Sequence, residues 1–536
     1  MSMRCAFFLA SILLLTAPNA SAIEYSDVEI VQNIQRLAEA TNSRLVNVSA
    51  QSRQFYKQRD FKPAWDIESV RSRQAWQLID VLRAADTHGL KPNDYEVYAI
   101  ARDLGGDIAS AQFAAKLDIR LTTAYLTYAR HMLRGRVTPA DMPRNWEVDL
   151  RYRNLVTLLD SALANENIAQ SLQTLVPPHQ DYEHLRTALK RYRDIRNSGD
   201  FVQIPSGALL RRGDIDSRIR LLKQRLISSG DLVPQTNDKS KLFDEVLEQA
   251  LRRFQRRHGL EVDGILGPKT LQALNVSLAS RIRQIELNLE RLRWLPQDLG
   301  DRHIRINIAA YELGVVEKRN RIMSMRVIVG ERFHQTPIFS RDMTYIAFSP
   351  YWNIPASIAI NEMLPKIKND PEYFKRENIL VYAGWNDKER KVDPQDIDWS
   401  QYSLKEFPFH LRQQPGPSNA LGLVKFMLPN PYAIYLHDTP ARQLFTRSAR
   451  SFSHGCIRLE KPFVLAKYLL RNLPEWGEER RTLVAASGVE TNVQLPKPIP
   501  VHLMYLTAWA DSNGRVHFRD DVYERDIELA RILGYQ

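Results

Sequence analysis

Apolar residues in the first 200 positions recur at the spacing of an α-helix. The clearest row has members four, three, four and four residues apart: Leu117, Leu121, Ala124, Tyr128 and Met132. These positions share one face of a helix, and Gly135 and Pro139 supply the signals that end it. The residue types that chemistry needs do not gather in this region. Residues 23–205 are therefore predicted to form a helical scaffold domain.

A second helical unit is predicted over residues 206–298. Asp214 is placed to cap its first helix, and two apolar rows mark the first and second helices: Ile215, Ile219, Leu222 and Leu226, then Phe243, Leu247, Ala250 and Phe254. Gly259 is a helix stop, and Pro268 suits the first turn of a third helix. We expect a compact three-helix domain.

The period of the pattern changes to two after His303, where Ile304, Ile306 and Ile308 alternate with polar residues. Ser512-Asn513-Gly514 is typical of a β-hairpin turn. The other predicted elements are strands at 325–329, 344–348 and 432–437, a helix at 462–473, and hairpin arms at 501–509 and 515–518. Residues 299–500 should form a mainly-β domain, with a hairpin and tail at 501–536 packed on it. The predicted fold class is multidomain α+β.

A long stretch at about 354–415 interrupts the strands of this third domain. Such a length inside a compact domain indicates an inserted subdomain or lid, because long loops without a function are uncommon. It contains several aromatic residues: Tyr382, Trp385, Trp399 and Tyr402. These rings either stack on sugar faces or form a small core of the insert's own.

The first 22 residues have the three parts of a secretory signal peptide. Arg4 precedes an apolar run from Cys5 to Leu15, and Ala20-Ser21-Ala22 offers a cleavage site. The run is shorter than the roughly 18 apolar residues of a transmembrane helix. Cleavage after Ala22 would leave Cys456 as the one cysteine, which excludes an intramolecular disulfide and a thiolate zinc site. We expect no metal site and no membrane span in the mature protein.

The formal net charge is +12, and removing Arg4 leaves +11. For an exported protein this favours acidic wall polymers or anionic lipid surfaces as partners rather than nucleic acid. The alternative is that scattered basic residues serve solubility alone.

Ser453-His454-Gly455-Cys456-Ile457-Arg458 is the strongest chemical signal in the chain. A cysteine becomes a nucleophile as its thiolate, so it needs a base or a positive environment. His437 ends an apolar strand nineteen residues earlier and shares a strand face with Tyr435. Gly455 gives the backbone freedom, so that the N–H groups of Gly455 and Cys456 are candidate oxyanion donors. The alternative is a buried, inert cysteine near ordinary core histidines.

These segments resemble the L,D-transpeptidase family. The resemblance rests on residues 434–440 (Ile-Tyr-Leu-His-Asp-Thr-Pro) and on 453–459 (Ser-His-Gly-Cys-Ile-Arg-Leu), with supporting matches at Val329-Gly330, Thr336-Pro337, Trp352-Asn353-Ile354-Pro355 and Asn419-Ala420-Leu421-Gly422. Residues 254–274 are similar to a three-helix peptidoglycan-binding domain. Gly89-Leu90-Lys91-Pro92 and Asp94-Tyr95 resemble the scaffold domain of large periplasmic members.

The resemblance implies a role for each matching residue. Cys456 would be the acylated nucleophile and His437 the general base, its imidazole oriented by the backbone carbonyl of Asp438. Many members have glycine at that next position, which leaves a contribution of the Asp438 carboxylate open. Gly455 belongs to the catalytic motif, and the expected substrate-binding residues are Tyr435, His454, Arg458, Trp352 and Asn353.

The implied reaction is acyl transfer from a tetrapeptide stem to an amine of a neighbouring stem, giving 3→3 cross-links in the cell wall. It implies no cofactor, a periplasmic location, acylation by carbapenems, and stem peptides and glycan as partners, with other wall synthases or hydrolases as further candidates. Two alternatives remain: a Cys-His carboxypeptidase that hydrolyses stem peptides, and a non-catalytic wall-binding scaffold.

Overall fold

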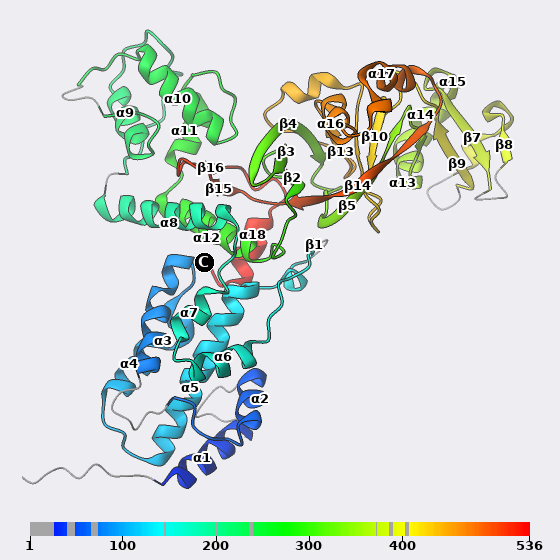
Figure 1. Cartoon of the computed structure of the whole chain (residues 1–536). Coiled ribbons are helices and arrows are strands. Elements are labelled where there is room, and N and C mark those ends of the chain that lie inside the picture. Colours follow the sequence, from blue (N-terminus) through cyan, green and yellow to red (C-terminus); the bar gives the residue numbers. More distant parts are fainter. Residues whose placement is uncertain are drawn as a thin grey trace, which may run out of the picture. The chain divides into compact units, whose positions relative to one another are not determined.

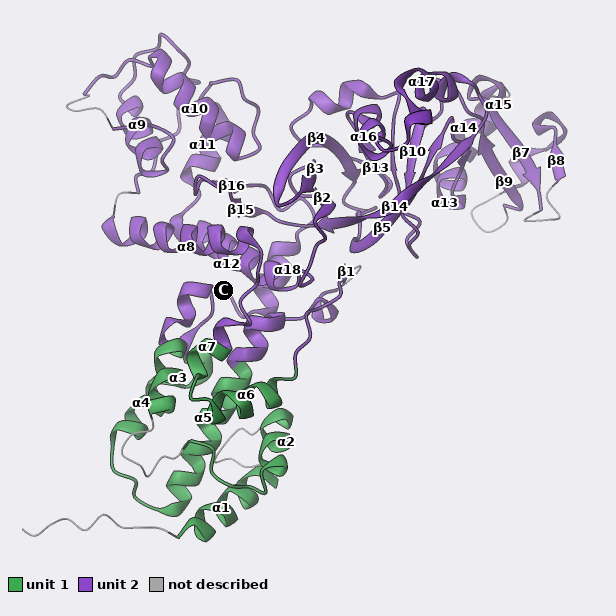
Figure 2. Ribbon diagram, viewed as in Figure 1, with its two compact units in different colours: residues 1–82, 93–127, 154–171 green, residues 83–92, 128–153, 172–536 purple. Residues whose placement is uncertain are grey.

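The computed structural model describes residues 26–39, 49–65, 73–143, 146–199, 201–234, 239–370, 372–384, 390–402 and 407–535. The predicted signal peptide and Trp385 lie outside these ranges. The chain forms two compact units, which Figure 2 colours separately. One comprises residues 1–82, 93–127 and 154–171, and the other comprises residues 83–92, 128–153 and 172–536.

The first unit is helical. The helices of this region are α1 (Asp27–Glu39), α2 (Ala50–Gln58), α3 (Arg73–Arg83), α4 (Val97–Gly105), α5 (Ala111–Arg134), α6 (Leu155–Ala164) and α7 (Ile168–Gln173). All five residues of the predicted apolar row are buried on α5. Asp118, on the same helix, accepts hydrogen bonds from the Tyr56 hydroxyl at 2.6 Å and from the backbone N–H of Trp65 at 2.9 Å. This buried acceptor ties the segment after α2 to α5.

In the second unit, three helices form the predicted compact domain around their own apolar core: α9 (Arg218–Ser228), α10 (Glu245–Arg257) and α11 (Pro268–Asn275). The first of them starts later than expected. Ser217 stands at its N-cap instead of Asp214, and Ile215 precedes the helix with 77% of its surface exposed. Asp214 and Ile215 are instead in an extended segment, where Ile215 bridges Leu242.

The β-domain is built on a ten-stranded mixed sheet in which β14 pairs with both β2 and β5, so that the sheet closes on itself (Figure 1). Closure leaves few free strand edges. The strands are β1 (Trp146–Glu147), β2 (Arg302–Asn307), β3 (Glu312–Glu317), β4 (Asn320–Gly330), β5 (Ile338–Phe348), β10 (Val424–Met427), β11 (Leu436–His437), β12 (Ser451–Ser453), β13 (Ile457–Leu459) and β14 (Thr491–Met504). The interior is filled by their alternate apolar residues and by α16 (Pro462–Leu469).

The strands expected at 325–329 and 344–348 are longer than predicted, and two others are shortened or divided. The strand expected at 432–437 is reduced to Leu436–His437, because the Asn430 side chain hydrogen-bonds the backbone N–H of Tyr432 and Ile434 and the carbonyl of Ile434. The segment expected at 501–509 is divided. Its first residues end β14, and the hairpin consists of β15 (Ala508–Ala510) and β16 (Val516–Phe518).

The hairpin was expected to pack on the β-domain, and this part of the prediction is wrong. Its apolar residues lie in one core with α8 (Gln180–Ser198) and α12 (Leu278–Arg293). The Arg257 side chain of α10 also donates to the Val516 carbonyl at 2.7 Å. The alternating pattern at 501–509 does not show where the hairpin packs. The chain leaves the sheet after Met504, and the Thr507 N–H then donates to the Asn288 side chain of α12.

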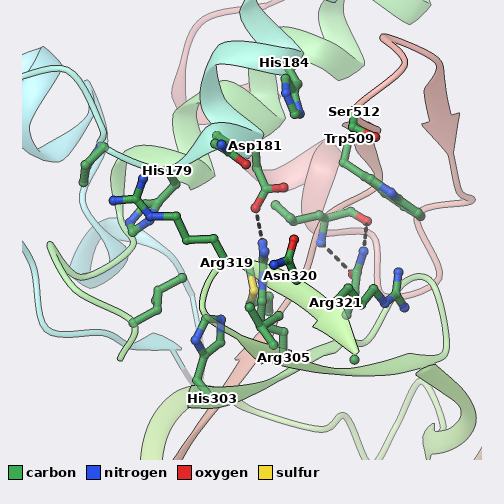
Figure 3. A pocket seen from close by; sticks show the side chains of 18 of the residues that line it. His179, Asp181, His184, His303, Arg305, Arg319, Asn320, Arg321, Trp509 and Ser512 are labelled. Atoms are coloured by element: carbon green, nitrogen blue, oxygen red, sulfur yellow. Dashed lines mark hydrogen bonds and ion pairs between the residues drawn. The ribbon is translucent and has the colours of Figure 1, made fainter. Parts of the chain in front are cut away.

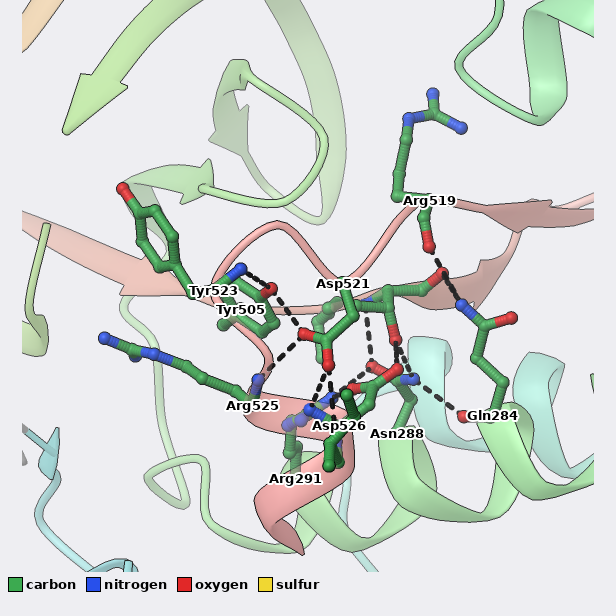
Figure 4. A network of polar contacts seen from close by, with 12 residues as sticks. Gln284, Asn288, Arg291, Tyr505, Arg519, Asp521, Tyr523, Arg525 and Asp526 are labelled. Carbon is green, nitrogen blue, oxygen red and sulfur yellow. Dashed lines mark hydrogen bonds and ion pairs between the residues drawn. The ribbon is translucent and has the colours of Figure 1, made fainter. Parts of the chain in front are cut away.

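The tail after the hairpin does contact the β-domain (Figure 4). Asp521 accepts from the Tyr505 hydroxyl at 2.6 Å, and that hydroxyl accepts from the Tyr523 N–H at 3.0 Å. The Tyr523 hydroxyl in turn donates to the Gly330 carbonyl at 2.5 Å. The tail continues into α18 (Arg525–Ile532), whose Asp526 is paired with Arg291 of α12 at 2.5 Å.

The insert is a small subdomain with its own sheet and core. Its sheet has the order β6-β9-β7-β8, and its elements are β6 (Trp352–Asn353), α13 (Ala356–Ile358), α14 (Leu364–Asn369), α15 (Tyr373–Arg376), β7 (Ile379–Ala383), β8 (Arg390–Val392) and β9 (Phe409–Gln413). Trp399 and Tyr402 belong to this core, which favours the core interpretation of the insert's aromatic residues. Asn419, fully buried, donates to the carbonyls of Pro350 and Gln414 and so joins both ends of the insert.

Within the described residues, none of the helices combines the length and apolar character needed to cross a bilayer.

Candidate active site around Cys456

The strand register places the candidate catalytic side chains on one face. β11 and β13 are parallel, with Leu436 opposite Ile457 and His437 opposite Arg458. Side chains alternate between faces along a strand and match across paired positions. Tyr435 and Cys456, one step earlier on each segment, therefore share the face of His437 and Arg458, and Leu436 and Ile457 point into the apolar core.

The Cys456 thiol is half-buried and reachable from solvent. Its S–H donates to the Ala433 carbonyl at 3.7 Å, and its sulfur accepts from the backbone N–H and the hydroxyl of Tyr435. Burial raises the pKa of the Cys456 thiol above its usual value, because it penalises the thiolate. The Tyr435 hydrogen bonds and the positive charges of Lys425 and Arg458 oppose that rise.

Tyr435 lies at the centre of the site. Its hydroxyl donates to the sulfur of Cys456 and accepts from the Trp352 indole N–H. The Lys425 ammonium lies 3.9 Å from the centre of its ring, and the His437 ring meets it edge-on at 5.7 Å. Burial and the neighbouring sulfur raise the pKa of Tyr435 well above its usual value, so the phenol stays protonated. It is therefore a hydrogen-bond donor to the thiolate rather than a base.

His437 is almost fully buried, and its Nδ1–H donates to the Asp438 carbonyl at 2.5 Å. A carbonyl only accepts, so this contact fixes the proton on Nδ1 and leaves Nε2 as the basic nitrogen. Burial, aided by the charges of Arg458 and Lys425, lowers the pKa of His437 to about 3, against the carbonyls of Asp438 and Leu421. The imidazole is neutral at pH 7. His437 and Cys456 are diagonal neighbours on the shared face, with the Tyr435 ring beside both.

The Asp438 carboxylate faces away from the imidazole. It accepts from the Leu423 N–H at 3.0 Å and from the Arg442 guanidinium at 2.5 Å. Gly422, whose φ is +62°, lies so close to this carboxylate that a Cβ there would overlap it. The side chain thus holds the Gly422–Leu423 turn, while the backbone carbonyl of the same residue holds His437.

The loop before Cys456 is supported by two hydroxyl groups. Thr336 Oγ1 donates to the Gly455 carbonyl at 2.7 Å, and Ser453 Oγ donates to the Cys456 carbonyl at 2.5 Å. Gly455 has a φ of +109°, a conformation that favours glycine. Its N–H donates to Ser453 Oγ at 3.2 Å, so this expected oxyanion donor already has an acceptor. For the Cys456 N–H no acceptor is found in the described part of the chain, and it is the better candidate.

Arg458 brings a positive charge to this face, and no acid is paired with it in the part of the chain that the structure describes. Its Nε is buried with no hydrogen-bond partner among the described residues. Burial lowers the pKa of its guanidinium, and the Cys456 sulfur opposes this change. A partly buried guanidinium in this state is suited to bind a carboxylate of a ligand.

The other predicted substrate-binding residues lie at the border with the insert. Trp352 reaches the site through its bond to Tyr435, whereas Asn353 is exposed and accepts from Arg412 of β9 at 2.9 Å. His454 pairs through Nε2 with Glu362 of the insert. The structure therefore brings Trp352 to the Tyr435 hydroxyl, which bonds the sulfur, and leaves Asn353 and His454 at the rim.

Three ranges of the chain match models of known protein families. The model described as "L,D-transpeptidase catalytic domain" matches residues 301–488, the range that contains His437 and Cys456. This range is similar to the L,D-transpeptidase catalytic domain. Two further models match outside it: "Scaffold domain" at residues 50–189 and "Putative peptidoglycan binding domain" at residues 216–274.

The L,D-transpeptidase domain also has a curated relative. A protein of Haemophilus influenzae named "Putative L,D-transpeptidase" is 38% identical over 272 residues, which cover 49% of this chain and 54% of the relative. The chain thus spans about half the length of that relative. The N-acetylmuramoyl-L-alanine amidase CwlM of Mycobacterium tuberculosis is 39% identical over 75 residues, covering 13% of this chain and 18% of the relative.

Among solved structures, an L,D-transpeptidase of Stackebrandtia nassauensis is similar at 14% identity and a TM-score of 0.22, covering 56% of this chain and 96% of that one. The corresponding structure from Xylanimonas cellulosilytica has 14% identity and a TM-score of 0.18, covering 56% and 98%.

Sequence reasoning missed one residue of the candidate active site. Lys425 lies on β10 opposite His437 and therefore projects to the same face as Cys456. The sequence did carry a signal for a strand here, because Lys425 stands between the apolar residues Val424 and Phe426. Using that signal requires knowing that β10 pairs with β11, which the sequence does not show.

The second unit has another hollow, of about 630 Å³, in which Figure 3 shows Asp181 reaching toward Arg305. Its labelled side chains come from the helical part, from β2 to β4 and from the hairpin: His179, Asp181, His184, His303, Arg305, Arg319, Asn320, Arg321, Trp509 and Ser512. The candidate catalytic residues do not line it, so it is separate from the transpeptidase site.

Proposed function

We propose that this chain is a peptidoglycan L,D-transpeptidase that forms 3→3 cross-links through a thioester on Cys456. The observation that carries the proposal is the shared face of Cys456, Tyr435 and His437 inside a domain of the L,D-transpeptidase family. A half-buried thiol that accepts two hydrogen bonds and lies near two cations is arranged as a nucleophile, not as core filling.

In the acylation step, the Cys456 sulfur attacks the carbonyl carbon that follows the L-centre of the third, diamino acid residue of a tetrapeptide stem. Its proton passes to Nε2 of His437. The bond to the terminal D-alanine then breaks, and the imidazolium returns the proton to the leaving amine. Because thiol and imidazole are both neutral at rest, proton transfer accompanies attack rather than preceding it.

In the second step, an amine of a neighbouring stem attacks the thioester carbonyl. His437 takes the proton of this amine and gives it to the departing sulfur, which restores the neutral pair. The Cys456 N–H would stabilise the oxyanion in both steps, a contribution typically worth about 3–4 kcal/mol. Arg458 would bind a stem carboxylate, and Trp352, Asn353 and His454 would contact the substrate where the insert meets the cleft.

The three-helix domain and the predicted signal peptide also support a function at the cell wall. The peptidoglycan-binding domain would hold the enzyme on glycan and stem peptides, which are its expected partners together with other wall synthases or hydrolases. A hollow of about 370 Å³ between α9 and α10 is lined by Arg220, Lys223 and Lys239, by apolar Ile227 and Val246, and by Asp244, whose carboxylate lies 3.9 Å from the Lys223 ammonium. The excess of basic residues would suit an acidic, partly apolar polymer. Export by the predicted signal peptide, cut after Ala22, would place the enzyme in the periplasm.

The test is muropeptide analysis. Purified protein is incubated with disaccharide tetrapeptides, and the products are identified by mass spectrometry. The expected products are cross-linked dimers and free D-alanine, absent with Cys456→Ala. Tripeptide monomers without dimers would instead identify a carboxypeptidase, and equal wall binding by wild type and Cys456→Ala without turnover would identify a scaffold.

A second measurement addresses the nucleophile alone. A carbapenem is expected to add its mass to the intact wild-type protein and to leave Cys456→Ala unchanged. An adduct that persists in Cys456→Ala would place the acylation at another residue.

A further inference from the structure

Three side chains with metal-binding atoms converge beside the nucleophile loop, residues 453–456. Within the described residues, Glu331, His334 and His454 each offer one ligand atom, and these atoms all lie within 4.8 Å of one another. Glu331 and His334 belong to the turn after β4, and His454 precedes Gly455. The two histidines are 120 positions apart in the sequence, so no spacing pattern reveals the group.

The backbone holds the two segments together. The Glu331 N–H donates to the Ser453 carbonyl at 2.9 Å, and the His334 N–H closes its own turn on the Glu331 carbonyl at 3.1 Å. The turn that carries Glu331 and His334 is thus bonded directly to the segment that carries His454. Ligands on such a tied framework lose little conformational entropy when an ion binds.

The side chains already face one another. His334 Nδ1 lies 2.8 Å from Glu331 Oε1, and the rings of His334 and His454 have their centres 4.9 Å apart. The Glu331 and His334 side chains are both about half exposed, at 47%. Solvent access gives an ion a way in and leaves room for a water ligand.

We propose that Glu331, His334 and His454 bind a divalent transition-metal ion such as Zn²⁺ at the rim of the cysteine cleft. Two imidazoles and one carboxylate with an open fourth position are a donor set that Zn²⁺ prefers. Tetrahedral ligand atoms about 2.0–2.1 Å from zinc lie about 3.3 Å apart. Exposed side chains can close to that separation by small rotations from the distances found here.

The ring nitrogen of His454 that already has a partner determines how this ring would bind the ion. Nε2 of His454 contacts Glu362, which leaves Nδ1 for the ion. Glu362 then becomes the outer carboxylate that fixes the ring, as is usual for metal-binding histidines. Since Glu362 belongs to the insert, an ion bound here would also strengthen the contact between the insert and the nucleophile loop.

The experiment is calorimetric titration of the metal-free full chain with Zn²⁺, which needs no turnover and is independent of the proposed acyl transfer. Wild type is expected to bind one ion at this site. His334→Ala and Glu331→Gln should weaken binding more than the roughly 10- to 100-fold typical of losing an outer partner, and Glu362→Gln by about that amount. His410→Ala, which removes a histidine of the insert outside the group, is the matched control and should bind like wild type.

Cys456→Ala separates this site from binding to the thiol. Retained affinity in Cys456→Ala, and a cobalt spectrum without a sulfur-to-metal band, support the proposal. It is overturned if wild type binds no Zn²⁺, if Cys456→Ala abolishes binding, or if His334→Ala and Glu331→Gln both bind like wild type. Circular dichroism of each variant shows that a loss of binding is not a loss of fold.

Discussion

At the scale of single residues, Cys456 is subject to opposing influences. Burial disfavours its thiolate, while the Tyr435 hydrogen bonds and two cations favour it, and burial prevails. His437, kept neutral by burial, is not an imidazolium partner at rest. The site is therefore expected to behave differently from a cysteine–histidine pair that exists as a preformed ion pair.

This difference predicts a pH profile for alkylation of Cys456 by iodoacetamide. Since the raised thiol pKa lies above neutrality, the rate should increase about tenfold per pH unit between pH 6 and 8. A preformed ion pair would instead give a plateau across that range. Alkylation rates measured by intact mass spectrometry decide between the two.

Removing one of the cations should make the thiol less reactive. In Lys425→Met the pKa of Cys456 rises further, because a positive charge near the thiolate is lost. We expect alkylation at pH 8 to slow by about threefold to tenfold, up to one pKa unit. Lys391→Met, in the insert strand β8, is the matched control. An unchanged rate in Lys425→Met would mean that its charge does not act on the sulfur.

The Asp438 carboxylate is expected to support the fold rather than catalysis. Asp438→Asn weakens the contacts with Leu423 and Arg442, at a cost of about 1 kcal/mol given that Arg442 is half exposed. The turnover number should stay within about threefold of wild type while the calorimetric unfolding temperature falls. A loss of turnover with unchanged stability would instead assign the carboxylate a direct role.

The sequence identified the residues whose chemistry is unusual, and it could not identify those made important by position. Cys456 and His437 were found because a lone thiol near histidines is informative even without coordinates. Lys425 was missed because surface and cleft lysines look alike until strand pairing is known. His334 and Glu331 were missed because their partner, His454, is distant in the sequence.

At the scale of elements, the nucleophile loop depends on the segment after β4. The fully buried Thr336 accepts from the Gly330 N–H at 2.9 Å and donates to the Gly455 carbonyl at 2.7 Å. One hydroxyl thus connects the two segments on which Cys456 is positioned.

Thr336→Val should uncouple the nucleophile loop from the segment after β4. The substitution preserves shape but leaves a buried N–H and a buried carbonyl without partners, at about 1–3 kcal/mol each. We expect a lower unfolding temperature and a turnover number reduced by at least about tenfold, while Thr336→Ser, which keeps the hydroxyl, should retain both. Equal behaviour of the valine and serine variants would contradict a role for the hydroxyl.

Periodicity predicted the long helices well and the extent of the strands poorly: β4, β5 and β14 are all longer than expected. α5 and the second helix of the three-helix domain follow their apolar rows because packing there repeats over several turns. The strand at 432–437 was overestimated because a single side chain, Asn430, captures backbone groups that a ladder would otherwise use. Alternation describes which residues are buried, but not which partner receives their hydrogen bonds.

At the scale of the whole molecule, β14 is the strand on which the transpeptidase sheet closes. It pairs with β2 on one side and β5 on the other, although it follows the family match that ends at residue 488. Removing it would expose two strand edges and the apolar interior.

A chain truncated after residue 490 is therefore expected not to fold its β-domain. It should lack the cooperative calorimetric transition of that domain and should fail to bind a carbapenem. A matched chain that ends after residue 520 keeps β14 and the hairpin and should recover the transition in part. A folded, acylated product of the shorter chain would show that β14 is dispensable.

Composition and periodicity indicated helical and β-rich parts, but not how the chain connects them. The compact units cut across the predicted scaffold range, because residues 83–92, 128–153 and 172–199 group with the second unit. The hairpin at the end of the chain joins α8 and α12 rather than the sheet. Such long-range pairings depend on tertiary contacts that no local pattern encodes.

The late position of β14 has a consequence for synthesis of the chain. Residues 437 and 456 leave the ribosome before the strand that completes their sheet, so a growing polypeptide carries the thiol without a complete pocket around it. Reactivity would be acquired only when the segment beyond residue 490 has joined the fold. The order in which the strands emerge would thus keep the thiol inactive until the β-domain is complete.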